Sequence, residues 1–558
     1  MSCAPLSPVP EAAAFRRDPA QVMQLARLGR SHPTRLSFLR ILLRRMQSEA
    51  WQFDRPVWDI DARGVGRAVY RARGPERTYS LVAFAHDLPP DQRSDRVIAT
   101  AWDATFALFD GDPTTADLDR LATNVPLQEA GRVTQAELTL SRANRSVRLF
   151  AHVVGALAAG RQPDPQMLAD TGYLMRTTAV YGSGKFGAAS HASISTRPEV
   201  AAPFQAEMLT VWLIRSFTVD LVEHLAALAS PTATRLSPTL RRALGVGNST
   251  GLGMAPFLVK HPILLNNWMM VREEALARVR AQPTATPRTV EAFRSALTRA
   301  TANARLWTSE HPVQVPRLTE LREGLAVLSA HVTDPWPGDT AHPWDALWRW
   351  GEATLPGEAQ EALLALMLEP HGDLIDGLAT CYSEDEDAAF PIDGAMTVGT
   401  VRDLLRANYG WALDPDYTSQ PATARFWYVS EDKQEPRLGE RFDEPGAELE
   451  LPLDIGRQAA ALHDALDGLP NAAPIARLLL ERPDLRLILR RVQITRTRPF
   501  AEIRGNLIAA DMLPIDMLRA KLAVFGATRF DPRSDRWLRI SLFQGAPYPD
   551  ELPLERDL

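Results

Sequence analysis

The chain has 558 residues and a formal net charge of −6 at pH 7. Its length exceeds what one hydrophobic core usually supports, so we expect more than one compact region. The acidic balance argues against a general nucleic-acid-binding protein, because such proteins gain affinity by covering phosphates with a basic face. The two cysteines, Cys3 and Cys381, are too few for a disulfide framework and lack zinc-ligand spacing, which favours a reducing cytoplasm.

The sequence predicts neither a targeting segment nor a membrane span. Residues 1–20 contain Glu11 and Asp18 and lack an uninterrupted apolar stretch. The most apolar helical stretch, Phe204–Leu228, is interrupted by four charged residues: Glu207, Arg215, Asp220 and Glu223. We therefore expect a soluble protein without a membrane partner, in which this stretch is a buried helix.

The first region, residues 1–113, is predicted to mix helices with strands. Helices are expected at Ala20–Arg30 and Pro33–Glu49. Residues that favour strands follow, with partial alternation, at Gly66–Arg73, Thr78–His86 and Arg96–Phe109. Segments rich in glycine and proline separate them, so a three-stranded meander is the simplest interpretation.

The second region, residues 114–410, is predicted to be helical, because its apolar residues recur at intervals of three and four. The expected helices are Thr134–Ala159, Pro165–Arg176, Pro198–Leu228, Ala255–Arg280, Thr289–Arg305, Thr319–His331 and Glu358–Leu368. The breaks between them are rich in proline and threonine and are interpreted as surface connections.

The third region, residues 411–558, returns to mixed structure. Strands are expected at Ala424–Val429, Glu448–Leu453, Leu485–Thr497 and Trp537–Phe543, and helices at Asp454–Asp467 and Pro514–Ala523. The chain is thus predicted to be α+β and predominantly α. A central helical core would be flanked by N-terminal and C-terminal regions that contain small antiparallel sheets.

Lysine is scarce, which draws attention to the places where it is kept. Four of the 62 Lys+Arg residues are lysine, namely Lys185, Lys260, Lys433 and Lys521. The first two lie in or just beyond the two glycine-dense segments of the chain. Lysine supplies a compact charge for an anion, and its amine can act as a base or form an imine when burial lowers its pKa, which arginine cannot readily do.

The first glycine-dense segment runs from Arg176 to Gly187. Its glycines allow several backbone N–H groups to converge on a phosphate or carboxylate beside Lys185. The spacing is not that of a P-loop, because Phe186 stands where the metal-binding hydroxyl belongs. The candidate residues are Arg176, Gly182, Gly184, Lys185 and Gly187, with Tyr181 as a proton-moving group. A tight turn between helices, with the lysine in solvent, fits the same residues.

The second glycine-dense segment runs from Gly245 to Pro256 and leads into an expected helix. Pro256 suits the first helical turn, so the glycines before it would present N–H donors at the positive end of that helix. The candidate residues are Gly247, Gly251, Gly253 and Lys260, with Ser249 and His261 able to move protons. Close packing of two helices is the alternative reason for these glycines.

Two further patterns give weaker hypotheses. Gly247–Gly251 matches G-x-S-x-G, in which hydrolases hold a serine nucleophile on a strand-to-helix turn, but Arg241–Leu244 is a poor buried strand. Asp220 and His224 lie four residues apart on one helical face, which fits an ordinary helix contact, a carboxylate that orients a histidine, or a metal pair. No metal site is predicted, because the eleven histidines are dispersed without ligand spacing.

The sequence therefore predicts a soluble cytoplasmic enzyme that binds a small anionic molecule at the two glycine-dense segments. Lys185, Tyr181, Ser249 and His261 are its candidate catalytic residues, while the reaction type and any cofactor stay open. The main alternative is a non-catalytic helical scaffold or a subunit of a homo-oligomer, and a minor one is a serine hydrolase or acyltransferase that uses Ser249. Neither nucleic acid nor a membrane is an expected partner.

Overall fold

The structure, a computed structural model of the whole chain, describes residues 10–89, 101–126, 134–181, 194, 196–251, 262–310, 312–333, 336, 341–382, 390–417, 452–504, 514–532, 537–555 and 558. The chain divides into two compact units. The helical unit comprises Met1–Leu36, Gly251–Val524 and Pro532–Arg536. The sheet unit comprises Ser37–Thr250, Phe525–Asp531 and Trp537–Leu558.

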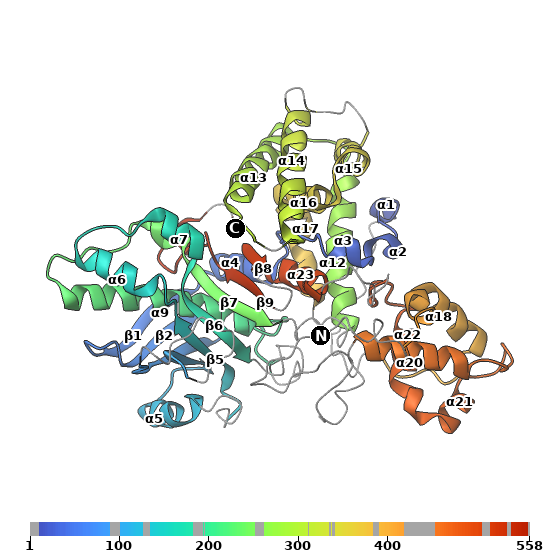
Figure 1. Cartoon of the computed structure of the whole chain (residues 1–558), viewed down its shortest axis with the longest axis horizontal. Coiled ribbons are helices and arrows are strands. Elements are labelled where there is room, and N and C mark those ends of the chain that lie inside the picture. Colours follow the sequence, from blue (N-terminus) through green and yellow to red (C-terminus); the bar gives the residue numbers. More distant parts are fainter. Residues whose placement is uncertain are drawn as a thin grey trace. The chain divides into compact units, whose positions relative to one another are not determined.

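The described residues of the sheet unit form one nine-stranded sheet with the strand order β1-β2-β3-β4-β5-β6-β7-β9-β8 (Figure 1). The strands are β1 (Gln52–Ile60), β2 (Gly66–Arg73), β3 (Thr78–Ala85), β4 (Ala104–Asp110), β5 (Glu137–Arg145), β6 (Tyr173–Tyr181), β7 (Gly245–Gly251), β8 (Arg529–Pro532) and β9 (Trp537–Leu542). Strands β1 to β6 pair antiparallel in chain order, whereas β7 runs parallel to β6.

This sheet corrects the expected fold class. Helix predominates, as the sequence indicated, but the strands near the two ends of the chain do not form two small antiparallel sheets. Instead, β8 and β9 belong to the same mixed sheet as β1 to β4. Three of its strands, β5, β6 and β7, come from stretches that were expected to be helix or loop.

The expected helix Thr134–Ala159 is wrong in its first half, which forms β5, while its second half forms α6 (Phe150–Ala158). Leu138 and Leu140 alternate with Thr139 and Ser141, and all four side chains are buried because β5 is covered on both faces. This alternation is short and is followed directly by residues with helical spacing, so the sequence predicted one continuous helix over both segments.

The expected helix Pro165–Arg176 also ends early. Helix α7 (Pro165–Thr171) stops at Gly172, whose φ of 75° is the left-handed conformation that terminates many helices. Strand β6 begins at the next residue, Tyr173. The helix therefore ends five residues before its predicted end at Arg176, and the chain enters the sheet three residues before it.

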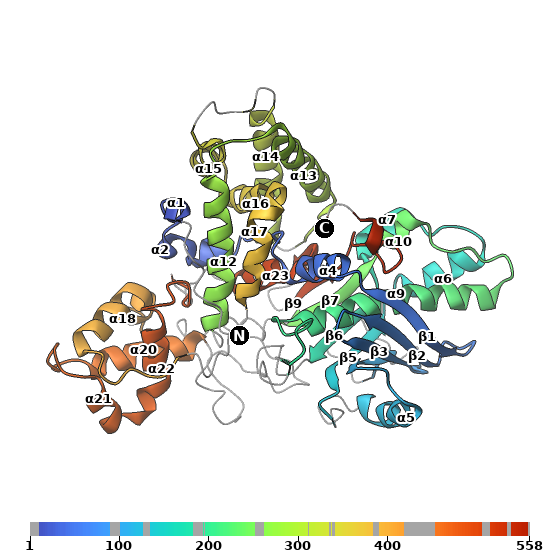
Figure 2. The same ribbon diagram turned by 180° about the vertical axis from the view of Figure 1, so that it is seen from behind.

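Helices cover both faces of the sheet. Helix α9 (Gln205–Ala229) crosses one face, where the Phe217 ring lies 5.4 Å from the Phe106 ring and 6.4 Å from the Tyr70 ring (Figure 2). The other face packs against α5 (Thr115–Asn124) through Leu118 and Leu121. Burial along nearly the whole of α9 explains why its sequence is apolar on all sides, and it confirms the helix expected at Pro198–Leu228.

The described part of the sheet unit also contains three shorter helical elements: α4 (Phe38–Ser48), α10 (Pro238–Ala243) and the 3-10 turn η8 (Leu552–Leu554). Helix α4 confirms the core of the helix expected at Pro33–Glu49, although its first turn is not helical. Strands β2 and β3 confirm two strands of the expected meander, and β4 occupies the end of the third. Strand β1 was not expected.

The helical unit is built on long helices. They are α12 (Pro262–Arg280), α13 (Pro287–Leu306), α14 (Gln314–His331), α15 (Pro343–Thr354), α16 (Gly357–Leu368), α18 (Val398–Leu413), α20 (Pro452–Ala465), α22 (Arg486–Ile494) and α23 (Pro514–Phe525). Shorter ones are α1 (Pro10–Ala13), α2 (Pro19–Val22), α3 (Leu25–Leu28), α17 (Gly372–Ile375) and α21 (Ala476–Glu481). The helices expected from residues 289, 319, 358, 454 and 514 are confirmed by α13, α14, α16, α20 and α23.

One predicted strand of the C-terminal region is wrong. Leu485–Thr497 forms helix α22, because Leu485, Ile488, Leu489 and Val492 follow helical spacing and are all buried. The strand expected at Trp537–Phe543 is confirmed by β9. The strand expected at Ala424–Val429 lies outside the described residues, and so does most of the one expected at Glu448–Leu453, whose last two residues begin α20. Across the described part of the chain, the helices lack the combination of length and apolarity needed to cross a bilayer.

Candidate functional site

The two glycine-dense segments are connected to neighbouring strands of one sheet. Strand β6 ends at Tyr181, inside the first segment and directly before its glycines, and β7 forms the beginning of the second. The two strands pair in parallel, with Tyr173 opposite Gly245 and Thr177 opposite Asn248. Because parallel strands run to the same edge of a sheet, both segments leave it at the same edge.

The glycines of β7 have a packing role within the sheet. A Cβ at Gly245 would lie 2.5 Å from the Leu542 carbonyl oxygen of β9, and one at Gly247 would lie 2.6 Å from Cγ of Tyr173. Both distances are far below van der Waals contact, so only glycine fits at these positions. The expected loop is thus a strand at least to Gly251, and Gly247 faces a tyrosine ring of β6.

The other predicted residues divide between β6, β7 and the part of the chain that is not described. Arg176 lies on β6 and is 3% exposed, and Tyr181 is the last residue of that strand. Gly182, Gly184, Lys185, Gly187, Gly253, Lys260 and His261 lie outside the described residues. Ser249 lies inside β7, two residues before its end, whereas a nucleophile elbow requires the serine at the turn itself.

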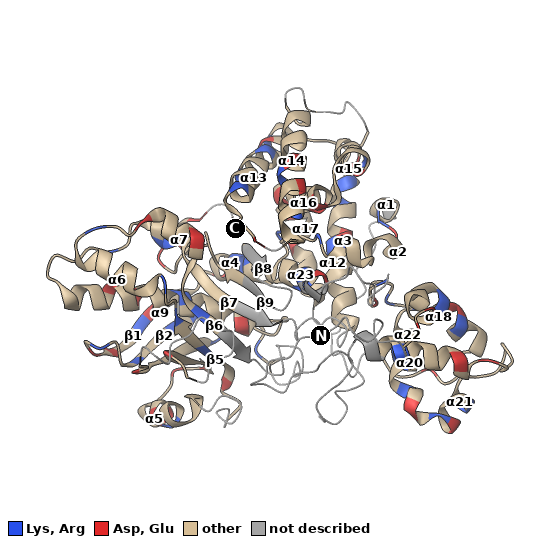
Figure 3. Cartoon of the chain, viewed as in Figure 1, with Lys and Arg blue, Asp and Glu red and all other residues tan. Residues whose placement is uncertain are grey.

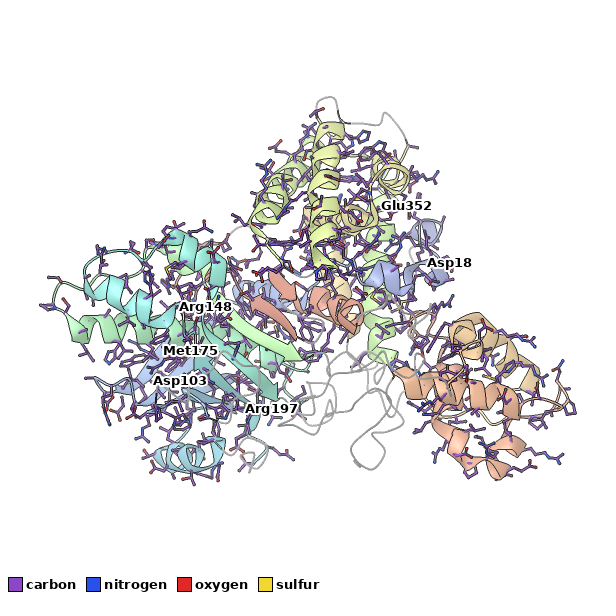
Figure 4. The ribbon with its side chains drawn as sticks, in the orientation of Figure 1. Asp18, Asp103, Arg148, Met175, Arg197 and Glu352 are labelled. Carbon is purple, nitrogen blue, oxygen red and sulfur yellow. The ribbon has the colours of Figure 1, made fainter. Side chains whose placement is uncertain are left out.

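The start of α9 lies close to the edge where β6 ends. Thr210 of α9 shares a 2.6 Å hydrogen bond with Thr139 of β5, whose neighbour Leu140 pairs with Tyr181. Arg197, just before α9, donates to Asp110 at 2.6 Å and to the Gln135 carbonyl at 3.0 Å (Figure 4). Helix α9 therefore connects β6 to β7 as a β-α-β crossover, with its positive end toward the carboxyl ends of both strands.

A cavity of about 740 Å³ lies at the other half of α9. Its volume is in the range of small-molecule sites. It is lined by residues of β1, β2, α9 and the C-terminal segment: Trp51, Gln52, Phe53, Asp54, Arg55, Trp58, Tyr70, Arg71, Leu213, Ser216, Asp220, Glu223, His224, Ala227, Ala233, Thr234, Arg235, Arg241, Pro549, Asp550 and Pro553. All of them belong to the sheet unit.

Asp220, which lines this cavity, accepts two hydrogen bonds from neighbouring side chains. The Tyr70 hydroxyl donates to Asp220 Oδ2 at 2.6 Å, and Arg55 Nη1 donates to the same oxygen at 2.7 Å. The Arg55 guanidinium also lies over the Trp58 ring, 4.4 Å from its centroid. Burial, followed by the Asp220 charge, raises the pKa of Tyr70 well above its usual value, so this hydroxyl stays protonated and keeps donating.

Glu223 and His224 lie next along the same helix face. Glu223 Oε1 accepts from the Leu236 amide at 3.1 Å, and burial raises the pKa of this carboxyl. His224 Nε2 lies 3.0 Å from the Ile60 carbonyl oxygen, which can only accept, so Nε2 carries a proton and Nδ1 is the acceptor whenever the ring is neutral. Asp220 and His224 therefore bond to different partners rather than to each other.

The helical unit contains a different kind of charge cluster, which is buried. Arg17 donates to Glu273 at 2.7 Å and to Glu361 at 3.3 Å, and Glu361 also accepts from Arg27 at 2.9 Å and lies 3.1 Å from Arg272. The side chains of Glu273 and Glu361 are 1% and 0% exposed. Figure 3 shows charged residues on the helices that carry them, α12 and α16.

One turn earlier on α16, Glu358 forms a second buried group with Arg519 of α23 and with His32, whose Nε2 lies 3.1 Å from its carboxylate. Burial works to raise the pKa of Glu358, but the Arg519 charge and the His32 hydrogen bond outweigh it and lower this pKa to about 2. These two groups attach the N-terminal segment and α23 to α16. Their charged side chains are almost fully buried and bind one another, so we assign them to packing rather than to ligand binding.

The sequence did not predict this cavity. The spacing of Asp220 and His224 was noted as a possible contact within one helix, but their partners lie far away in the chain, 150 residues away in the case of Tyr70. Across the described residues, no group of three or more histidine, cysteine, aspartate or glutamate residues could hold a metal ion. No family model, curated protein or solved structure matches this chain.

Proposed function

We propose that this chain is a cytoplasmic enzyme that binds a small anionic ligand, with a phosphate or carboxylate group, where β6 and β7 leave the sheet. The observation that carries the proposal is the parallel pairing of these two strands, because the carboxyl ends of parallel strands meet at one edge of a sheet. Ligands of α/β proteins commonly bind at the carboxyl ends of parallel strands.

The chemistry of the first segment suits an anion. Glycine residues after Tyr181 allow backbone N–H groups to turn toward a ligand, and Lys185 would supply the positive charge. Tyr181 and Ser249 are the nearby groups that could move a proton. The proposal uses residues of the sheet unit alone, and the reaction type is left open.

A thermal-shift screen tests this function. Inorganic phosphate, nucleotides, acyl-CoAs and dicarboxylates are added to the full-length protein, and at about 100 times its Kd a ligand should stabilise the protein by ~2.7 kcal/mol. Lys185→Ala should abolish the shift. Arg161→Ala removes an exposed positive charge elsewhere in the sheet unit and should leave the shift unchanged.

Two results would contradict the proposal. The first is a panel in which none of these anions raises Tm. The second is a shift that survives Lys185→Ala and is lost in Arg161→Ala, since binding would then depend on a different surface. If no anion binds and gel filtration shows a large stable assembly, the scaffold or homo-oligomer alternative takes its place.

A further inference from the structure

The cavity beside α9 is separate from the edge where β6 and β7 end. Helix α9 has 25 residues, so its two ends are roughly 37 Å apart. Thr210 lies near the β6 end, whereas Asp220, Glu223 and His224 of the cavity lie ten or more residues further along α9, at least ~15 Å away along the helix axis. A ligand in this cavity is therefore independent of the proposed anion site.

The polar groups that α9 presents to the cavity form one stripe. Ser216, Asp220, Glu223 and His224 follow helical spacing, and all four line the cavity. Asp220 and Glu223 offer carboxylate oxygens, and His224 offers its Nδ1 lone pair. The stripe is thus rich in acceptors.

Most other charges around the cavity neutralise one another. Three arginines donate to carboxylates at hydrogen-bond distance, namely Arg55 to Asp220 at 2.7 Å, Arg71 to Asp54 at 2.6 Å and Arg241 to Asp550 at 2.9 Å. Glu223 is compensated least, because the nearest nitrogen of Arg235 is 3.9 Å away and the Arg235 side chain is 90% exposed. The lining thus contains four carboxylates and four arginines, and Glu223 is the carboxylate with the most distant and most exposed partner.

Ser216 supplies an independent sign of a missing ligand. Its side chain is 7% exposed and lines the cavity, and among the described residues its Oγ has no hydrogen-bond partner. A buried hydroxyl without a partner is costly, so such groups usually pair with protein, water or ligand. This Oγ has less than 1 Å² exposed to solvent, so a bound donor group would satisfy it once the Ser216 side chain rotates toward the cavity.

We propose that this cavity binds an organic ammonium ligand, an alkylamine whose charged nitrogen donates to Glu223 and whose carbon chain lies against the aromatic wall of Trp58 and Tyr70. An ammonium group has three donors and no acceptor, which matches the acceptor stripe of α9. Aromatic faces attract cations, and the Trp58 ring already holds the Arg55 guanidinium. A neutral polyol would leave Glu223 with the exposed Arg235 as its cationic partner.

Calorimetric titration of the full-length protein tests this proposal with diaminobutane and, as an uncharged analogue of the same length, butanediol. Diaminobutane should bind, and butanediol should bind about tenfold more weakly or not at all. Glu223→Gln keeps the side-chain shape and should weaken the diamine about tenfold. The control Glu76→Gln removes an exposed carboxylate on the turn between β2 and β3 and should leave Kd unchanged.

A second variant protects the test against misfolding of Glu223→Gln. Ala227 is exposed and lines the cavity, so Ala227→Trp fills the space without changing any charge and should abolish binding. Equal binding of diamine and diol, no diamine binding to the wild type, or full binding in Ala227→Trp would each overturn the proposal. Lys185→Ala should retain diamine binding, which keeps this test separate from that of the anion site.

Discussion

Both units contain ion pairs between arginine and a carboxylate, but these pairs are buried in the helical unit and partly exposed around the cavity of the sheet unit. In the helical unit the carboxylates of Glu273, Glu358 and Glu361 are at most 1% exposed and bind buried arginines. In the sheet unit, carboxylates around the cavity are partly exposed: the Asp220 side chain is 32% exposed and that of Asp550 is 63% exposed.

This difference indicates different roles for the two sets of charges. A buried pair that loses one partner leaves an uncompensated charge in a low dielectric, so the buried clusters determine how the N-terminal segment packs on α16. Opening a partly exposed ion pair costs little free energy, because water replaces the missing partner. The cavity wall can therefore exchange partners with a ligand, and the buried clusters cannot.

The largest expected effect is that of Glu361→Gln. This change removes the carboxylate shared by Arg17, Arg27 and Arg272 and should destabilise the helical unit by about 3–5 kcal/mol. Urea unfolding followed by far-UV circular dichroism measures it. The matched control is Glu481→Gln, on a side chain that is 63% exposed and pairs with an exposed arginine, which should cost less than about 0.5 kcal/mol. Equal losses in both variants would show that burial does not distinguish the two classes of pair.

The next effect is acid sensitivity of the helical unit. Burial works to raise the pKa of Glu361, and the charges of Arg272, Arg17 and Arg27 outweigh it and lower the pKa to about 2. Since the unfolded value is 4.5, the stabilisation is fully present above that pH and is lost as pH falls toward 2, at about 3 kcal/mol. Melting temperatures at pH 6, 4 and 3 should therefore converge between wild type and Glu361→Gln. A constant difference across this range would contradict the lowered pKa.

The sequence predicted the helices of both units better than the sheet. Long amphipathic stretches such as α13 and α14 repeat their pattern over several turns, which makes them recognisable. Strand β5 has nine residues and β7 contains three glycines, so neither carries a period long enough to distinguish it from its neighbours. The parallel pairing of β6 with β7 depends on the crossover through α9, which no local pattern specifies.

The candidate sites also depend on long-range contacts that local sequence patterns do not specify. Glycine density located the edge of β6 and β7, but the conflict between a Gly247 Cβ and the Tyr173 ring depends on residues 74 positions apart in the chain (247 − 173 = 74). The cavity draws on β1, β2, α9 and Pro549–Pro553, so only the Asp220 and His224 spacing was visible in the sequence. Contacts of this range are set by tertiary packing rather than by local propensity.

A smaller effect of the opposite sign is expected for Lys521 of α23, which is fully buried. Burial lowers the pKa of its amine to about 7, below the unfolded value of 10.5, so folding opposes protonation. Stability of the wild type should rise with pH between about 7 and 10, where the unfolded chain binds more protons. Lys521→Met should raise stability at pH 7 by about 1–3 kcal/mol and remove that rise. A variant that is less stable than wild type at pH 7 would show that the amine contributes more than its burial costs.

The smallest expected effect is that of Asp220→Asn at the cavity. The amide still accepts from Tyr70 and Arg55, and both members of the ion pair with Arg55 are partly exposed, at 32% and 40%. The loss of stability should therefore stay below about 1 kcal/mol, measured by the same urea unfolding. A loss as large as that of Glu361→Gln would mean that Asp220 determines the packing of β1 and β2 on α9 and cannot change partners. A small loss means that the Arg55–Asp220 pair contributes little to the packing of β1 and β2 on α9, as expected for a partly exposed pair.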